Sequence, residues 1–216
     1  QTLDRRQKEL QLHLVDAKTG RSTLLLANTM PASWVNLHDA LVPLKSGGFI
    51  WASECTGFSH LTLHSASGEL QVTLTSGDWV VDGTSHKLVD EEGANCYFIG
   101  NRDDPKQTHL FRVPLSGGAV EQVTVGEGTH TVKLSRSFER FVDRYHSARE
   151  PVVVRLCSLV DGSVLRVLHD CSNEPDLLRL RPHLLPPKFV SFPSTDGTVE
   201  LHAALYMPPA DVFGPG

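Results

Sequence analysis

The sequence contains no apolar run approaching the roughly 18 residues that span a membrane as a helix, so no membrane partner is expected. Its first residues, Gln1–Arg6, lack the apolar core of a signal peptide. They also lack an initiator methionine, which we interpret as a truncation point of a longer protein. Basic residues are scattered, and the net charge of −5 with a pI near 6.1 excludes the basic surface typical of nucleic-acid binding.

Cysteine is scarce, and its spacing suits neither zinc nor an obvious disulfide. The four residues are Cys55, Cys96, Cys157 and Cys171. Only Cys157 and Cys171 are close in sequence. A hairpin turn at Asp161-Gly162 would place a residue near position 166 opposite Cys157, so Cys171 is out of register for a bridge. We therefore expect free thiols, as is typical of a reducing compartment.

Helical periodicity is nearly absent, and one β-pattern recurs four times instead. Each copy has an alternating strand, a glycine-containing turn and a second alternating strand, at 10–26, 60–74, 109–123 and 152–168. The turn glycines Gly20, Gly68, Gly117 and Gly162 are 48, 49 and 45 residues apart. Glycine suits these turns because tight hairpins need positive φ.

Two further strands precede each of the last three hairpins. The first strands are expected at about 40–44, 86–90 and 129–134, and the second at 49–53, 96–100 and 138–145. Four short antiparallel strands at this period are typical of a propeller blade, whereas a β-sandwich would not repeat in this way. We therefore predict an all-β fold, a partial β-propeller of about 3.5 four-stranded blades. The blades are placed at about 1–26, 40–75, 86–124 and 129–170.

The repeat ends near residue 172, and the rest of the chain has a different pattern. A connector is predicted at 173–188, with a helix-permissive stretch at 173–180 and a proline-rich part at 181–188. A separate hairpin at 189–209 turns at Asp196-Gly197. We expect residues 189–216 to begin another domain.

Several segments match a known family in collinear order. They include W-V-N-L-H-D at 34–39, F-I-W-A-S-E at 49–54, L-T-S-G-D-W at 74–79, H-L-F-R-V at 109–113 and F-V-D at 141–143. Together they resemble the propeller of the dipeptidyl peptidase IV family, in the prolyl oligopeptidase clan of serine peptidases. The hairpin ending Y-M-P-P at 206–209 resembles the strand pair that opens the family's α/β-hydrolase domain. The sequence E-C-T-G-F at 54–58 is closer to the cytosolic branch, the relatives of dipeptidyl peptidases 8 and 9.

The resemblance implies a parent enzyme that releases N-terminal dipeptides after proline or alanine, by Ser-His-Asp acyl transfer. Its substrates would be peptides beginning Xaa-Pro or Xaa-Ala, and it would act without metal or organic cofactor. The propeller would gate and shape a chamber closed by the protein's own hydrolase domain. A cytoplasmic location and a homodimer are also implied. Because this sequence has no G-x-S-x-G elbow, no catalytic residue is assigned, and the chain alone is expected to be inert.

In relatives, the loop that matches W-V-N-L-H-D faces the chamber. Asn36, His38 and Asp39 are therefore the candidate substrate-binding residues. The alternative is that they hydrogen-bond the edge of a blade. The pair Glu91-Glu92 invites comparison with the family's amino-anchoring glutamates, but we interpret it as part of a solvated turn. A structural role is expected for the remaining histidines and for Trp34, Trp51 and Trp79, the last three as packing aromatics.

A non-catalytic propeller scaffold for protein–protein interaction is the rival hypothesis. Scaffold blades of the WD-repeat kind carry Gly-His and Trp-Asp pairs at fixed positions, and here the nearest match is a single reversed pair, Asp78-Trp79. The sequence beyond Gly216 would separate the two hypotheses. A Tyr-Gly-Gly-Pro-like segment followed by an elbow serine would favour the peptidase, and another blade would favour the scaffold.

Overall fold

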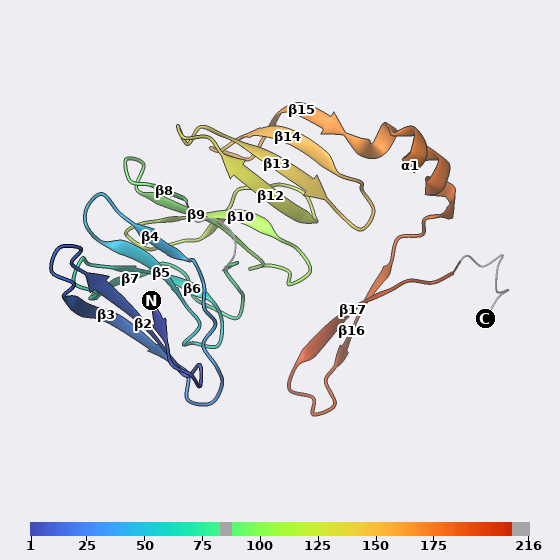
Figure 1. Ribbon diagram of the computed structural model, residues 1–216. Helices are drawn as coiled ribbons and strands as arrows, with labels where there is room; N and C mark the ends of the chain where they lie inside the picture. Colours follow the sequence, from blue (N-terminus) through green and yellow to red (C-terminus); the bar gives the residue numbers. More distant parts are fainter. Residues whose placement is uncertain (83–87, 209–216) are drawn as a thin grey trace. The chain divides into compact units, whose positions relative to one another are not determined.

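The computed structural model describes residues 1–82 and 88–208, which fold almost entirely as antiparallel β-sheets (Figure 1). The first sheet contains β1 (Thr2–Leu3), β2 (Glu9–Val15) and β3 (Ser22–Thr29). The second contains β4 (Leu41–Pro43), β5 (Phe49–Ser53), β6 (His60–His64) and β7 (Leu70–Thr73). The third contains β8 (Leu88–Asp90), β9 (Asn95–Gly100), β10 (His109–Pro114) and β11 (Glu121–Gln122). The fourth contains β12 (Thr129–Leu134), β13 (Arg140–His146), β14 (Val153–Ser158) and β15 (Val164–Asp170).

Within each sheet the strands follow chain order, and every neighbour is antiparallel. Three consecutive four-stranded meanders are the blades of a β-propeller. The predicted all-β fold class, a partial propeller, is confirmed. The strand predicted at 86–90 is seen from Leu88, and positions 86 and 87 lie outside the described residues.

The glycine turns behave as the repeat predicts. Gly20, Gly68, Gly117 and Gly162 have φ of 71°, 89°, 81° and 72°, in the left-handed region that favours glycine. Gly68 has a second constraint, because a Cβ there would lie 2.0 Å from the carbonyl oxygen of Leu25. The β6–β7 turn therefore packs directly against the backbone of β3 in the preceding sheet.

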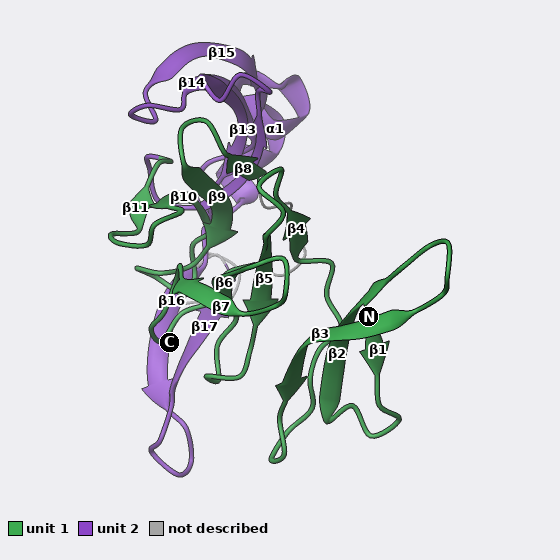
Figure 2. Ribbon diagram, turned by 90° about the vertical axis from the view of Figure 1, so that its left-hand side faces the viewer, with its two compact units in different colours: residues 1–124 green, residues 125–216 purple. Residues whose placement is uncertain are grey.

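Residues 1–124 form one compact unit, and residues 125–216 form a second (Figure 2). In the first unit, apolar side chains fill the space between successive sheets. One cluster joins the first and second sheets and includes Leu10, Leu12, Val35, Phe49 and Trp51. The other joins the second and third sheets and includes Ile50, Leu61, Trp79, Phe98, Phe111 and Val113. Burial on both faces explains why β5 reads F-I-W-A, a continuous apolar run rather than an alternating one.

One packing expectation is wrong. Trp51 and Trp79 are buried, but Trp34 is 62% exposed. The neighbouring Val35 occupies the core at this point, and its backbone N–H donates to the carbonyl of Gln7 at 2.7 Å. Val35 therefore takes the core position that was expected of Trp34, and Trp34 is exposed to solvent.

The second unit holds the fourth sheet, a short helical segment and a hairpin. The segment comprises η1 (Cys171–Asn173), α1 (Pro175–Leu180) and η2 (Arg181–His183). Proline at the first position of α1 suits a helix start, because its missing N–H would have no intrahelical partner. The hairpin pairs β16 (Lys188–Pro193) with β17 (Glu200–Leu205), and residues 209–216 lie outside the described part. The division into propeller, connector and hydrolase segment stays a prediction.

The hairpin turn is closed by Asp196. Its carboxylate accepts hydrogen bonds from the Ser194 hydroxyl and from the backbone N–H and hydroxyl of Thr198, and these lower its pKa to about 2.

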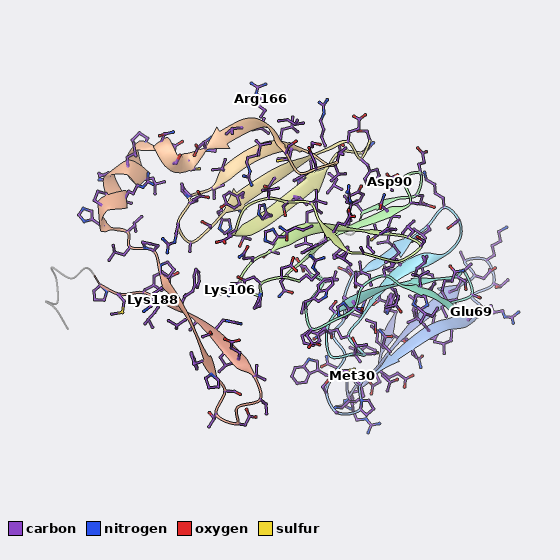
Figure 3. The ribbon with its side chains drawn as sticks, turned by 180° about the vertical axis from the view of Figure 1, so that it is seen from behind. Met30, Glu69, Asp90, Lys106, Arg166 and Lys188 are labelled. Atoms are coloured by element: carbon purple, nitrogen blue, oxygen red, sulfur yellow. The ribbon has the colours of Figure 1, made fainter. Side chains whose placement is uncertain are left out.

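Charged side chains elsewhere, such as Glu69 before β7 and Arg166 on β15, project outward (Figure 3). No helix within 1–82 and 88–208 is long and apolar enough to cross a membrane.

Candidate functional site

The loop before β4 is fixed at both ends and open in the middle. Val35 and Ala40 are 3% and 2% exposed, and each belongs to one of the two cores of the first unit. Between them, Asn36, Leu37 and Asp39 are exposed and His38 is half-buried. The loop is thus anchored by a buried side chain at each end, with residues 36–39 between them at the surface.

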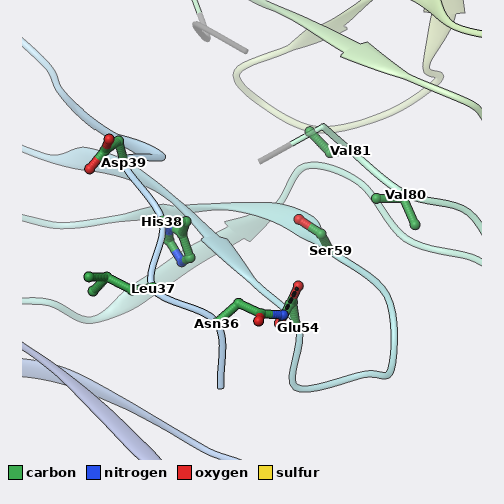
Figure 4. Close-up of a pocket in the computed structure, with 8 residues that line it drawn as sticks. All are labelled: Asn36, Leu37, His38, Asp39, Glu54, Ser59, Val80 and Val81. Atoms are coloured by element: carbon green, nitrogen blue, oxygen red, sulfur yellow. Dashed lines mark hydrogen bonds between the residues drawn. The ribbon is translucent and has the colours of Figure 1, made fainter. Parts of the chain in front are cut away.

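A pocket of about 370 Å³ lies over this segment (Figure 4). Its lining comes from the loop before β4, from the two ends of the β5–β6 turn and from the link between the second and third sheets. The residues are Asn36, Leu37, His38, Asp39, Glu54, Ser59, Val80 and Val81. All three predicted site residues therefore line one pocket, together with side chains that are distant in sequence.

Asn36 forms hydrogen bonds with the carboxylate of Glu54. Its side-chain nitrogen donates to both oxygens of Glu54, at 2.8 and 3.1 Å (Figure 4). Glu54 opens the turn after β5, in which the Gly57 backbone N–H donates to the Glu54 carbonyl. This contact joins the loop to the neighbouring turn, so Asn36 fixes the position of a charged group in the pocket.

His38 is oriented by the sheet beneath it. Its Nδ1 accepts the backbone N–H of Ala40 at 3.2 Å, so in the neutral ring the proton is on Nε2. The imidazole also packs against the indole of Trp51, with ring centroids 4.6 Å apart. The Nδ1 contact is the kind of hydrogen bond that the structural alternative expects, made here to the residue before β4. The same contacts give the ring a defined orientation at the pocket.

Asp39 lies at the far end of the segment, with its carboxylate directed away from the Asn36–Glu54 pair (Figure 4). Among the eight lining residues, two are acidic and none is a lysine or arginine. The pocket consequently combines two carboxylates with the apolar side chains of Leu37, Val80 and Val81.

Of the pair Glu91-Glu92, which resembles the family's amino-anchoring glutamates, Glu91 makes contacts that stabilise the fold. The Glu91 carboxylate accepts the backbone N–H groups of Lys45 and Ser46, at 2.9 and 3.3 Å. It thereby caps the β4–β5 turn of the preceding sheet. Residues 91–94 themselves form the turn between β8 and β9, in agreement with the interpretation of the pair.

Two histidines make the same hydrogen-bonded contact with a threonine in successive sheets, which we call a His–Thr clasp. His60 Nε2 donates to the carbonyl of Gly77 at 2.7 Å, so in the neutral ring Nδ1 accepts the Thr75 hydroxyl at 3.1 Å. His109 repeats the contact with Thr124, at 3.0 Å. In both cases the threonine oxygen also accepts the backbone N–H of the residue after the histidine. Each clasp closes the end of its sheet, which is a structural role.

A third histidine belongs to a buried ionic cluster in the fourth sheet. His130 Nδ1 lies 2.9 Å from the Asp143 carboxylate, and the Arg155 guanidinium lies 2.7 Å from the same oxygen. The side chains of His130 and Asp143 are 0% and 2% exposed. Arg155 also stacks on the ring of Tyr145, with its Cζ 4.4 Å from the ring centroid. Both contacts fall on the same carboxylate oxygen, and they offset part of the cost of burying Asp143.

The four cysteines are free, as expected. Burial raises the pKa of the Cys157 thiol, which favours the protonated, unreactive form.

Over the described ranges, no group of three or more His, Cys, Asp or Glu side chains could hold a metal ion.

Reasoning from the sequence did not find Glu54, Ser59, Val80 or Val81 as site residues. Their approach to the loop depends on packing between two sheets, which no local spacing reports. The Thr75 and Thr124 clasps were detectable, because each threonine follows its histidine by 15 residues and the two clasps are one repeat apart.

Comparisons with known proteins agree with this architecture. The family model described as "Dipeptidyl peptidase IV (DPP IV) N-terminal region" matches residues 1–152. Dipeptidyl peptidase 8 of Mus musculus is 31% identical in an alignment 209 residues long, and the match covers 81% of this chain and 23% of the relative. Probable dipeptidyl-aminopeptidase B of Neosartorya fischeri is 28% identical over 128 residues, covering 53% of this chain and 14% of that protein.

The fold of the chain is also similar to that of a solved dipeptidyl peptidase. The crystal structure of Porphyromonas gingivalis dipeptidyl peptidase 4 matches with a TM-score of 0.78 at 25% identity, over 94% of this chain and 28% of that one. The match therefore spans about a quarter of the mouse relative and of the bacterial structure, and 14% of the fungal relative.

Proposed function

The chain belongs to the dipeptidyl peptidase IV family, and from this we propose that the protein carrying it releases dipeptides from the N-termini of peptides. The substrates have proline or alanine at the second position. The chemistry is acyl transfer by a serine, histidine and aspartate outside these residues. The β16–β17 hairpin is proposed as the opening of the α/β-hydrolase domain that carries the serine.

In this proposal the propeller forms the wall of the substrate chamber and limits access to short, unfolded peptides. The observation that carries the assignment is the pocket over Asn36, His38 and Asp39, in the loop whose sequence resembles the family's chamber-facing segment. His38 is proposed to contact the peptide through its imidazole, which the Nδ1 contact with Ala40 and the packing against Trp51 orient at the pocket. A peptide carbonyl is a suitable acceptor.

Three further properties are proposed from the family resemblance. The chain divides at about residues 172 and 188 into propeller, connector and hydrolase segment. The protein acts in the cytoplasm, since E-C-T-G-F at 54–58 resembles the cytosolic branch. It assembles as a homodimer.

The substrate contact of His38 predicts a kinetic effect. In the full-length protein, His38→Ala should raise KM for an Ala-Pro amide severalfold and leave kcat nearly unchanged. The reason is that a contact made equally in ground and transition states contributes to binding only. Steady-state kinetics, expressed per folded molecule, measure the effect.

His64 offers a matched control. Like His38, it packs against an aromatic ring of the second sheet, with its ring centroid 5.2 Å from that of Phe49, but it does not line the pocket. His64→Ala should reduce stability through the same kind of lost packing without changing KM. Equal KM values for wild type and His38→Ala would contradict the substrate-binding role of this loop.

A further inference from the structure

We infer that Glu54 gives this pocket a preference for a cationic side chain on the first residue of the peptide substrate. The inference rests on the proposed function of the pocket. Glu54 is half-buried, and both its oxygens are held by one side-chain nitrogen of Asn36. A carboxylate fixed in this way faces the pocket without having to be ordered when the ligand binds, which favours selectivity.

The charge balance of the lining supports this assignment. Glu54 and Asp39 are its only formally charged residues, and no lysine or arginine belongs to it. Among the lining residues, therefore, no cationic side chain neutralises the carboxylates. A lysine or arginine side chain could extend its apolar stem along Val80, which is 39% exposed, and place its charged end near Glu54. An acidic side chain would meet like charge there and bind less well.

Asn36 acts through Glu54 and is a positioning residue. Its amide is neutral and already donates to the carboxylate, so its removal would leave Glu54 less well placed without removing the charge. Asp39 is exposed, and solvent screens its charge more strongly than that of Glu54. Glu54 is therefore expected to dominate the preference.

Three substrates that differ only in the first side chain test the inference: Lys-Pro, norleucine-Pro and Glu-Pro amides. Norleucine has the stem of lysine without the ammonium group. The full-length protein should show the highest kcat/KM for Lys-Pro and the lowest for Glu-Pro. Glu54→Gln, which retains the shape, should reduce the Lys-to-norleucine ratio about three- to tenfold, mainly through KM. Asn36→Ala should produce part of this loss, and added salt should weaken the preference.

Glu69→Gln is the control for charge alone, because Glu69 is an exposed carboxylate of the same sheet that does not line the pocket. Its Lys-to-norleucine ratio should equal that of the wild type. If His38→Ala raises KM while Glu54→Gln leaves the ratio unchanged, the charge inference is wrong and the proposed function stands. If His38→Ala and Glu54→Gln both leave KM unchanged for all three substrates, the pocket does not bind the substrate, and both the charge inference and the proposed role of this loop are wrong.

Discussion

Gly68→Ala is expected to destabilise the protein by about 3–5 kcal/mol, because two independent costs fall on one methyl group. The residue has a φ of 89°, which a side chain disfavours. The new Cβ would also lie 2.0 Å from the Leu25 carbonyl oxygen, a backbone atom that cannot move aside without disturbing β3. Urea unfolding followed by tryptophan fluorescence measures the loss.

Gly20→Ala separates the two costs. Gly20 has the corresponding turn position and a φ of 71°, but no atom lies within 4 Å of its added Cβ. Only the cost of placing a side chain at positive φ applies, so the free energy of unfolding is expected to fall by about 1–2 kcal/mol. Equal losses for the two variants would show that the β6–β7 turn does not pack against β3 as described.

Asp143→Ala should cost about 3–5 kcal/mol, through loss of the shared anion in the fourth sheet. The substitution leaves the buried His130 without its carboxylate and the Arg155 guanidinium without its counter-ion. A positive charge held in a low-dielectric environment without a partner is destabilising. Denaturant unfolding of the full-length protein should show a lower midpoint for the propeller transition.

Asp176→Ala is the exposed counterpart. Asp176 pairs with Arg179 at 3.3 Å, but the two side chains are 89% and 75% exposed. Solvent screens such a pair, so its removal should produce no resolvable change. A similar small effect for Asp143→Ala would mean that the buried cluster is not a source of stability.

The sequence predicted the fold because the fold depends on local patterns. Strand alternation and the turn glycines repeat within each blade, so β12 and β5 were placed at their observed bounds. The expectation that Trp34 packs in the core is wrong, because in a loop no alternation indicates which of two adjacent apolar residues is buried. The residue type alone favoured burial.

The candidate site was only partly accessible to sequence reasoning. Asn36, His38 and Asp39 are consecutive or nearly so, and their family-like segment identified them. Glu54 approaches Asn36 from 18 positions away, and only the packing of the turn after β5 against the loop makes the contact. The role of Glu91 likewise depends on a neighbouring sheet, 46 residues away at Lys45.

The central claim is that this chain is the propeller part of a dipeptidyl peptidase whose nucleophile lies elsewhere in the protein. A parallel assay of the 216-residue chain and the full-length protein tests it most directly, with Gly-Pro and Ala-Pro chromogenic amides and an acylating phosphonate probe. The full-length protein should cleave both amides and carry the probe on one serine, whereas the chain should do neither. Stoichiometric labelling of a serine within these 216 residues, or a full-length protein that cleaves neither amide, would contradict the account.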